Sequence, residues 1–311
     1  MDEFTFLAAQ STELGVDAPP VRRLTHTLQD GRTVSALQYG DAATGTFAAP
    51  VVTFLHGAGL NAHTWDTTVL ALGLPALALD LPGHGDSSWR EDAAYVGPAL
   101  AADIAPAIAA WTDRPQLVVG QSLGGLTAAS LAHAHPELVR ELVVVDITPG
   151  IDPNGDASSI AAFFAGPTDW ASRDELVDRA LAFGLGGSRE AATRGVFLNS
   201  RVREDGRVEW KHHFAHLANR LAADPSAAAE SQAQQRALRG ALSATGWDDL
   251  AAAAAPITLV RGERGFVTET DAEEFRRRLP EATIVVVPSG HNVQEELPVP
   301  LAALIGDLAR D

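Results

Sequence analysis

The chain has 311 residues, of which 46% are hydrophobic, which is enough for one large domain or for one domain with an inserted subdomain. Its formal net charge of −17 at pH 7 disfavours binding to nucleic acid or to anionic membrane surfaces, because both carry negative charge. The sequence has no cysteine, which excludes disulfides, thiolate metal sites and cysteine nucleophiles.

Residues 1 to about 20 are expected to form an N-terminal extension with one short helix, which ends before Pro19 and Pro20. The chain begins with acidic residues rather than with a basic segment and an apolar run, so we expect no signal peptide. No apolar stretch is long enough for a membrane span. The sequence therefore predicts a cytoplasmic protein.

Strands and helices alternate through the first half of the chain. Residues 21–39 are typical of two strands joined by a turn at residues 29–31. Apolar strands are then predicted at 51–55, 76–79, 116–119 and 142–145, with helices from about residue 64, over 96–111 and over 126–134. Such alternation indicates an α/β fold, in which parallel strands are connected by crossover helices.

The alternation stops between residues 148 and 247. This stretch contains helical patterns at 172–183 and 218–242, and a hairpin or simple turn around Asp205 and Gly206. Strand and helix patterns resume at 256–260, 270–279, 283–287 and 299–309. We therefore predict an α/β core of residues 1–147 and 248–311, with residues 148–247 as a mainly helical insertion.

The sequence around Ser122 predicts a nucleophile elbow. It has the pattern Gly-X-Ser-X-Gly over residues 120–124, and it joins an apolar strand to an Ala- and Leu-rich helix. A serine at such a sharp turn needs small neighbours, which Gly120 and Gly124 supply. The alternative is that Ser122 only caps the helix. The strand and the two glycines favour the nucleophile.

Four further motifs accompany the elbow: His56-Gly57, the run from Asp80 to Ser87, Val145-Asp146 and Gly290-His291. Together they resemble the α/β-hydrolase fold superfamily, from about Val21 to the C-terminus. The likeness is greatest to small actinobacterial ester hydrolases that carry a helical cap after the sixth strand. The resemblance implies a mostly parallel central sheet and a cap, here residues 148–247, that covers the nucleophile and shapes the substrate pockets.

The resemblance also implies the general base and the oxyanion hole. The base is His291, which follows Gly290 near the end of the chain. The backbone N–H groups of Leu123 and Ala58 are the expected oxyanion donors, with Gly59 as the alternative to Ala58.

Other histidines are assigned to structural or peripheral positions. We expect His56 and His84 to brace loops, and the three histidines of the insertion, His212, His213 and His216, to face solvent or line the pocket entrance.

The third member of the triad departs from the commonest pattern of the superfamily. Many relatives place an acid after the seventh strand, where this chain has Gly265. Asp146 ends the preceding strand, beside the elbow strand, and is our first choice for the carboxylate that orients His291. Glu263 is the alternative, although Arg261 and Arg264 flank it and could pair with it at the surface.

These expectations predict a serine esterase that acts on small-molecule carboxylic esters of short to medium acyl chain, with no cofactor and no metal. A serine nucleophile excludes the dehalogenase and epoxide hydrolase branches, which use aspartate. Lactonase, thioesterase, carbon–carbon hydrolase and perhydrolase chemistry all remain open, as does a ligand-binding receptor on the same fold. Phe163, Phe164, Trp170 and Phe183 are candidate walls of the acyl pocket.

Overall fold

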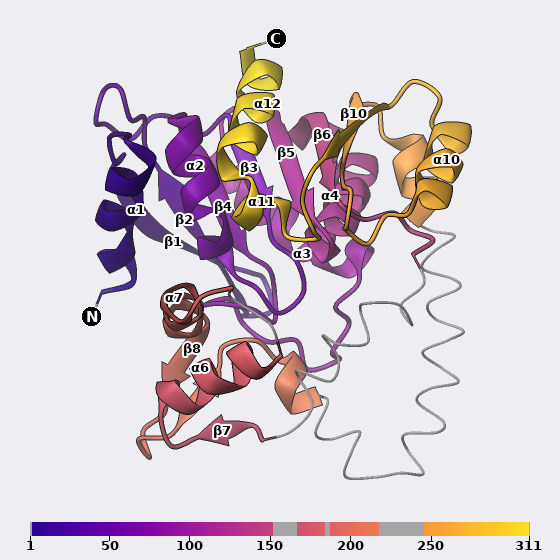
Figure 1. Ribbon diagram of the computed structural model, residues 1–311. Helices are drawn as coiled ribbons and strands as arrows, with labels where there is room; N and C mark the ends of the chain where they lie inside the picture. Colours follow the sequence, from indigo (N-terminus) through magenta and orange to yellow (C-terminus); the bar gives the residue numbers. More distant parts are fainter. Residues whose placement is uncertain (1, 152–166, 184–186, 218–245, 311) are drawn as a thin grey trace, which may run out of the picture.

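The structure is a computed structural model, and it describes residues 2–151, 167–183, 187–217 and 246–310. An eight-stranded sheet runs through it in the order β1-β2-β4-β3-β5-β6-β10-β11 (Figure 1). Its strands are β1 (Val21–Thr27), β2 (Thr33–Tyr39), β3 (Val52–Leu55), β4 (Ala76–Asp80), β5 (Gln116–Gln121), β6 (Val139–Val145), β10 (Ile257–Gly262) and β11 (Thr283–Val287). Within this sheet, only the pairs β1–β2 and β2–β4 are antiparallel.

Helices cover both faces of this sheet. The α-helices that flank it are α1 (Leu7–Leu14), α2 (Asp66–Leu72), α3 (Gly97–Trp111), α4 (Leu123–Ala134), α10 (Glu269–Arg278), α11 (Val293–Glu296) and α12 (Pro298–Arg310). Short 3-10 helices are η1 (Glu3–Phe6), η2 (Ala62–Trp65) and η3 (Pro136–Leu138).

The two faces of the sheet have separate hydrophobic cores, because successive side chains of a strand point to opposite faces. Val118 packs with residues of α3, α4 and α10, whereas its neighbours Leu117 and Val119 pack with residues of α1, α2 and α12. Both faces of the central strands are therefore buried, as expected of a parallel sheet.

The parallel strands bring the candidate site together at their carboxyl ends. Gln121, the last residue of β5, pairs with Val145 of β6, and Val145 pairs in turn with Val260 of β10. Ser122 directly follows β5, and Asp146 directly follows β6. These two residues therefore lie side by side at the carboxyl edge of the sheet.

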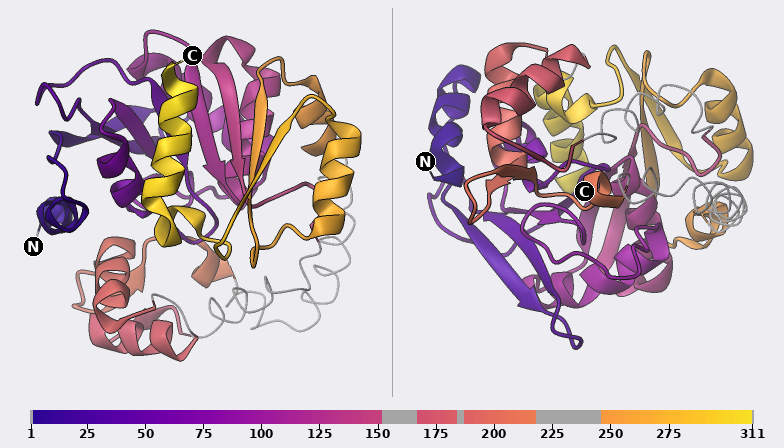
Figure 2. Two further views of the ribbon diagram at one scale, coloured as in Figure 1. Left: turned by 45° about the horizontal axis from the view of Figure 1, so that its top comes forward. Right: turned by 90° about the horizontal axis from the view of Figure 1, so that it is seen from below.

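Between β6 and β10, described residues within 169–215 form a unit with its own hydrophobic cluster. It contains α6 (Arg173–Ala182), α7 (Arg189–Asn199) and a small sheet of β7 (Asp169–Trp170), β9 (Val208–Trp210) and β8 (Ser200–Val202). It lies beyond one end of the strands of the large sheet (Figures 1 and 2).

The expected turn at residues 205–206 is thus a hairpin, while β7 and α7 were not predicted. The helix expected at 218–242 lies outside the described residues. The division into a core and a cap at residues 148–247 stays a prediction.

The N-terminal segment is built into the core. Leu7 is buried among residues of α2 and α12, and Glu3 pairs with Arg23 of β1. Within the ranges described above, no helix is both long enough and apolar enough to cross a membrane.

Candidate active site at the carboxyl edge of the sheet

Ser122 lies in a strained turn between β5 and α4. Its φ of 54° and ψ of −120° are unusual for a residue with a side chain. In the described part of the chain, the other non-glycine residues with positive φ are Ala93 and Asp146, so two of the three are site candidates. Strain of this kind costs about 1–3 kcal/mol and is concentrated at functional sites. The Ser122 side chain makes no capping hydrogen bond to α4, which disfavours the helix-cap alternative.

The two glycines of the motif are required by close packing. A Cβ atom on Gly120 would lie 2.3 Å from the carbonyl oxygen of Gly124. A Cβ atom on Gly124 would lie 2.2 Å from the carbonyl oxygen of Leu55. The sequence expectation that these positions must be small is confirmed.

Asp146 and His291 are hydrogen-bonded to each other. The distance from His291 Nδ1 to Asp146 Oδ2 is 2.8 Å, and the carboxylate is fully buried. Two backbone N–H groups also donate to this carboxylate: Gly262 to Oδ1 at 3.0 Å and Phe266 to Oδ2 at 2.6 Å. These three donors stabilise a buried negative charge, which would otherwise be costly.

Gly265 leaves the space that the Asp146 carboxylate occupies. A Cβ atom on Gly265 would lie 2.2 Å from Oδ1 and 2.3 Å from Oδ2 of Asp146. The next residue, Phe266, stacks its ring on the His291 imidazole, with 3.6 Å between centroids and 13° between planes. The loop after β10 therefore holds both the carboxylate and the imidazole.

The alternative acid, Glu263, is exposed, and no hydrogen bond or ion pair of its carboxylate is recorded with the described residues. The arginines that flank it have other partners. Arg261 pairs with Glu269 at 2.6 Å, and Arg264 lies 3.6 Å from Glu296. Within the described residues, neither arginine therefore pairs with Glu263.

The loop that carries Ala58 passes beside the nucleophile. A Cβ atom on Gly57 would lie 3.2 Å from Ser122 Cβ and 2.1 Å from Gln121 Oε1. Leu123 is the first residue of α4, so its N–H has no acceptor within that helix. Gln121 also donates to the carbonyl oxygen of His291 at 3.3 Å, a contact that the sequence pattern did not indicate.

His56 braces the loops at the site, as expected. Its Nδ1 donates to the carbonyl oxygen of Gly57 at 2.8 Å, and its Nε2 accepts from the Leu81 N–H at 2.9 Å. Burial lowers the pKa of His56, which keeps the ring neutral. His84 is also buried and bonds to Pro82.

The insertion histidines were expected to face solvent or to line the pocket entrance, and His212 does not face solvent. Its ring is fully buried and stacks on Trp210, and burial lowers its pKa to about 3. His212 follows β9, between the polar residues Lys211 and His213, and these neighbours gave no sign that its ring would be buried.

Two of the proposed pocket aromatics are described, and neither is shown to line a pocket. Trp170 packs against Trp210 inside the insertion, and Phe183 is 40% exposed beneath the Arg179 guanidinium. Phe163 and Phe164 lie outside the described residues.

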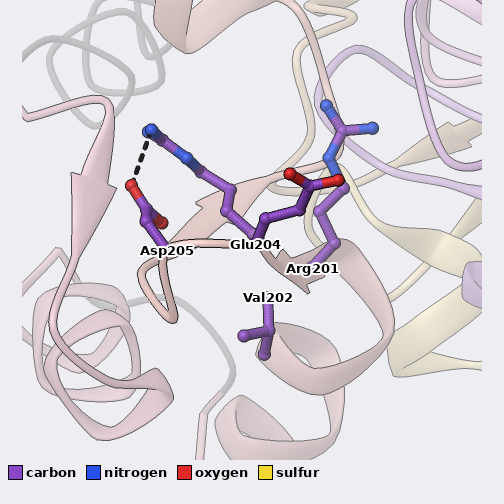
Figure 3. A pocket seen from close by; sticks show the side chains of 5 residues that line it. Arg201, Val202, Glu204 and Asp205 are labelled. Carbon is purple, nitrogen blue, oxygen red and sulfur yellow. Dashed lines mark hydrogen bonds and ion pairs between the residues drawn. The ribbon is translucent and has the colours of Figure 1, made fainter.

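A surface hollow over the β8–β9 turn is lined by residues 201–205 and crossed by the Arg203–Asp205 ion pair (Figure 3). It contains none of the candidate site residues.

No group of three or more His, Asp or Glu side chains is arranged to hold a metal ion within the described ranges.

Comparison with known proteins assigns the fold to a family. Residues 54–304 match the model of the alpha/beta hydrolase family. The esterase Rv0045c of Mycobacterium tuberculosis (strain ATCC 25618 / H37Rv) is 37% identical over an alignment 313 residues long, which covers 98% of this chain and 95% of that protein. A solved structure of this esterase has a TM-score of 0.80 at 35% identity and covers 100% of this chain and 99% of its own. The sn-1-specific diacylglycerol lipase ABHD11 of Mus musculus is 28% identical over 82% of this chain and 79% of its own length.

The family match and the near full-length likeness to an esterase agree with the expected class of enzyme, and the chain belongs to the alpha/beta hydrolase family.

Proposed function

We propose that the protein is a serine esterase that hydrolyses carboxylic esters of short to medium acyl chain through an acyl-enzyme on Ser122. The observation that carries the proposal is the hydrogen bond of 2.8 Å between His291 and Asp146, beside the strained serine of the elbow. The 37% identity to an esterase over nearly the whole chain supports the choice of substrate class.

In this mechanism Asp146 orients the histidine. An ionised carboxylate only accepts hydrogen bonds, so its contact with Nδ1 requires the proton of the neutral imidazole to be on Nδ1. Nε2 is then free to take the Ser122 proton. Asp146 also stabilises the imidazolium that forms.

The reaction takes place in two steps. Ser122 Oγ attacks the carbonyl carbon as its proton moves to His291, and the carbonyl π electrons move to the oxygen. When this intermediate collapses, the alcohol leaves with the proton from His291, and an acyl-enzyme remains. Water then attacks the acyl group with His291 again as base, which releases the acid and restores Ser122. The Ala58 and Leu123 N–H groups stabilise the oxyanion in both steps.

The substrate pocket belongs to residues 148–247 in this proposal, which act as a cap over Ser122. Contacts between the two parts support it, since Asn61 after β3 bonds to Leu198, and Asp86 after β4 pairs with Lys211. Both core residues follow strands at the carboxyl edge, where Ser122 lies.

A panel of substrates tests the substrate class. It contains p-nitrophenyl esters from acetate to decanoate, a matched acyl thioester and a lactone. We expect the highest kcat/KM on a short or medium oxygen ester. Turnover of the thioester or the lactone with no measurable hydrolysis of any oxygen ester would contradict the esterase assignment.

A further inference from the structure

The turn that carries Ala58 has a defined conformation. Gly57 to Leu60 form a β-turn in which the Leu60 N–H donates to the Gly57 carbonyl oxygen at 3.2 Å. Gly59 has a φ of 78°, which fits the third position of a type II turn. The Gly57 carbonyl oxygen also accepts from His56 Nδ1. Because C=O and N–H point in opposite directions in a trans peptide, these bonds fix the direction of the Ala58 N–H.

A residue of the insertion binds the far side of this turn. Asn199, the last residue of α7, donates from Nδ2 to the Gly59 carbonyl oxygen at 2.5 Å. That carbonyl belongs to the same peptide group as the Leu60 N–H. A hydrogen-bond chain therefore runs from the Asn199 amide through the Gly59–Leu60 peptide to the Gly57–Ala58 peptide, and it ends at the Ala58 N–H.

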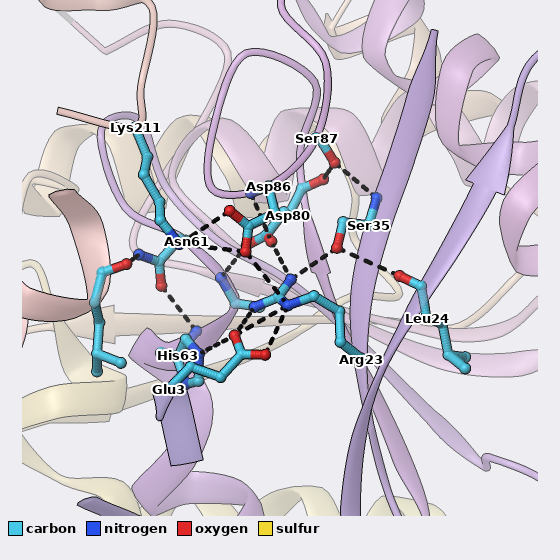
Figure 4. A network of polar contacts seen from close by, with 12 residues as sticks. Glu3, Arg23, Leu24, Ser35, Asn61, His63, Asp80, Asp86, Ser87 and Lys211 are labelled. Carbon is cyan, nitrogen blue, oxygen red and sulfur yellow. Dashed lines mark hydrogen bonds and ion pairs between the residues drawn. The ribbon is translucent and has the colours of Figure 1, made fainter. Parts of the chain in front are cut away.

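The contact is reciprocal. Asn61 Nδ2 donates to the Leu198 carbonyl oxygen at 3.1 Å and to Asn199 Oδ1 at 3.3 Å, while Asn61 Oδ1 caps η2 through the His63 N–H at 2.9 Å. Figure 4 shows Asn61 beside the charged network of Arg23 and Asp80. Each asparagine thus binds the segment that carries the other.

The core end of the loop is anchored by buried charge. Asp80 Oδ1 accepts from the Ala62 N–H at 2.8 Å, and Asp80 Oδ2 accepts from Arg23 at 2.7 Å (Figure 4). Burial raises the pKa of Asp80, but the Arg23 charge and the Ala62 N–H outweigh it and hold this pKa below its ordinary value. The carboxylate therefore stays ionised, and the loop is fixed to the core at one end and hydrogen-bonded to the insertion through Gly59 and Asn61.

We infer that Asn199 is a positioning residue for acyl transfer, because it orients and polarises the peptide chain that presents the Ala58 N–H to the oxyanion. Hydrogen bonds in series polarise one another, so loss of the first donor weakens the last one. The inference rests on the proposed function, with Ala58 as the oxyanion donor. If Asn199 has this role, the oxyanion hole is complete only when the insertion is bound to the Ala58 turn through Asn199.

Replacing Asn199 tests the inference. Asn199→Leu keeps a similar volume without a donor, and Asn199→Asp keeps the acceptor for Asn61 but places a carboxylate against the Gly59 carbonyl. We expect kcat on a p-nitrophenyl ester to fall about tenfold for Leu and further for Asp, with KM changed less than about twofold; loss of a direct donor costs on the order of 10²–10³. Thr193→Ala, an exposed change on the same helix, is the matched control and should leave kcat unchanged.

A transition-state analogue separates positioning from a structural role. The affinity for an alkyl boronic acid, whose serine adduct is tetrahedral and anionic, should fall in parallel with kcat/KM, whereas the affinity for the matching neutral carboxamide should not change. Wild-type kcat and boronate affinity in Asn199→Leu would overturn the inference.

Two further variants allow the role of Asn199 to be tested even if Asn199→Leu does not fold, and separately from the proposed function. If Asn199→Leu does not fold, Asn61→Asp serves instead, since it keeps the cap of η2 but loses both donors to the insertion. It should lower kcat with little change in KM, and wild-type kcat there would overturn the inference. Ser122→Ala is assayed in parallel, because activity in that variant contradicts the proposed function and not the role of Asn199.

Discussion

At the residue scale, Asp146 and Gly265 together explain why the proposed triad acid departs from the commonest pattern of the superfamily. The Asp146 carboxylate occupies the space that any side chain at Gly265 would need. The sequence predicted Asp146 because it follows the strand beside the elbow strand and because Gly265 stands where many relatives have an acid. It could not predict the Phe266 stack or the two N–H donors, since these depend on the loop conformation rather than on a residue pattern. The role of Asp146 in catalysis stays a prediction.

Substitutions at both positions test this role. Asp146→Asn should lower kcat by up to about 10⁴, because the histidine loses its orientation. Gly265→Ala should also lower kcat strongly, because its methyl group displaces the carboxylate, whereas Glu263→Gln should have little effect. The double variant Asp146→Gly/Gly265→Asp should recover at least about tenfold of the activity lost in Asp146→Gly. Steady-state kinetics measure kcat for each variant. A large loss of kcat in Glu263→Gln together with a normal kcat in Asp146→Asn would refute the role of Asp146 as the triad acid.

At the scale of elements, prediction was successful for the core and incomplete for the insertion. The strands and helices of the core follow from their apolar patterns, with ends shifted by a few residues. In the insertion, β7 to β9 have only two or three residues each, too few for any periodicity to appear. The polar helix α7 was not predicted. Its three buried positions, Ala192, Val196 and Leu198, do not form a clear apolar periodicity among its charged residues and Gly195.

The buried His212 should make the insertion sensitive to acid. Burial lowers its pKa from 6.5 to about 3, so below pH 6.5 the unfolded state binds a proton that the folded state does not. The stabilisation is therefore complete above pH 6.5 and is lost as pH falls towards 3, at up to about 1.4 kcal/mol per pH unit. His212→Phe removes this titration while keeping a ring against Trp210.

Thermal unfolding between pH 7 and pH 4 measures the effect. The Tm of the wild type should fall faster with acid than that of His212→Phe, and the other buried histidines cancel in the difference. Parallel Tm curves for the two proteins would show that His212 is not neutral and buried in the folded state.

At the scale of the whole molecule, the order of strands and helices was enough to predict the family fold. Parallel pairing through crossover helices followed from the alternation, and the family match over residues 54–304 agrees with it. The sequence did not reveal how residues 2–20 pack against the rest of the core, because the Glu3–Arg23 pair joins segments that no local pattern connects. The bond from Asn199 to the Ala58 turn was equally inaccessible, since it crosses 140 positions of sequence.

The central claim is that Ser122 is the acylated nucleophile, and intact-protein mass spectrometry tests it most directly. The wild type is incubated with a p-nitrophenyl alkylphosphonate, which esterifies an activated serine and releases p-nitrophenol. We expect one adduct per chain, mapped to Ser122 by peptide analysis, with ester hydrolysis lost in proportion to labelling. Ser122→Ala should fold normally, take up no label and show no hydrolysis. Labelling at another residue, or hydrolysis by folded Ser122→Ala at the wild-type rate, would contradict the claim.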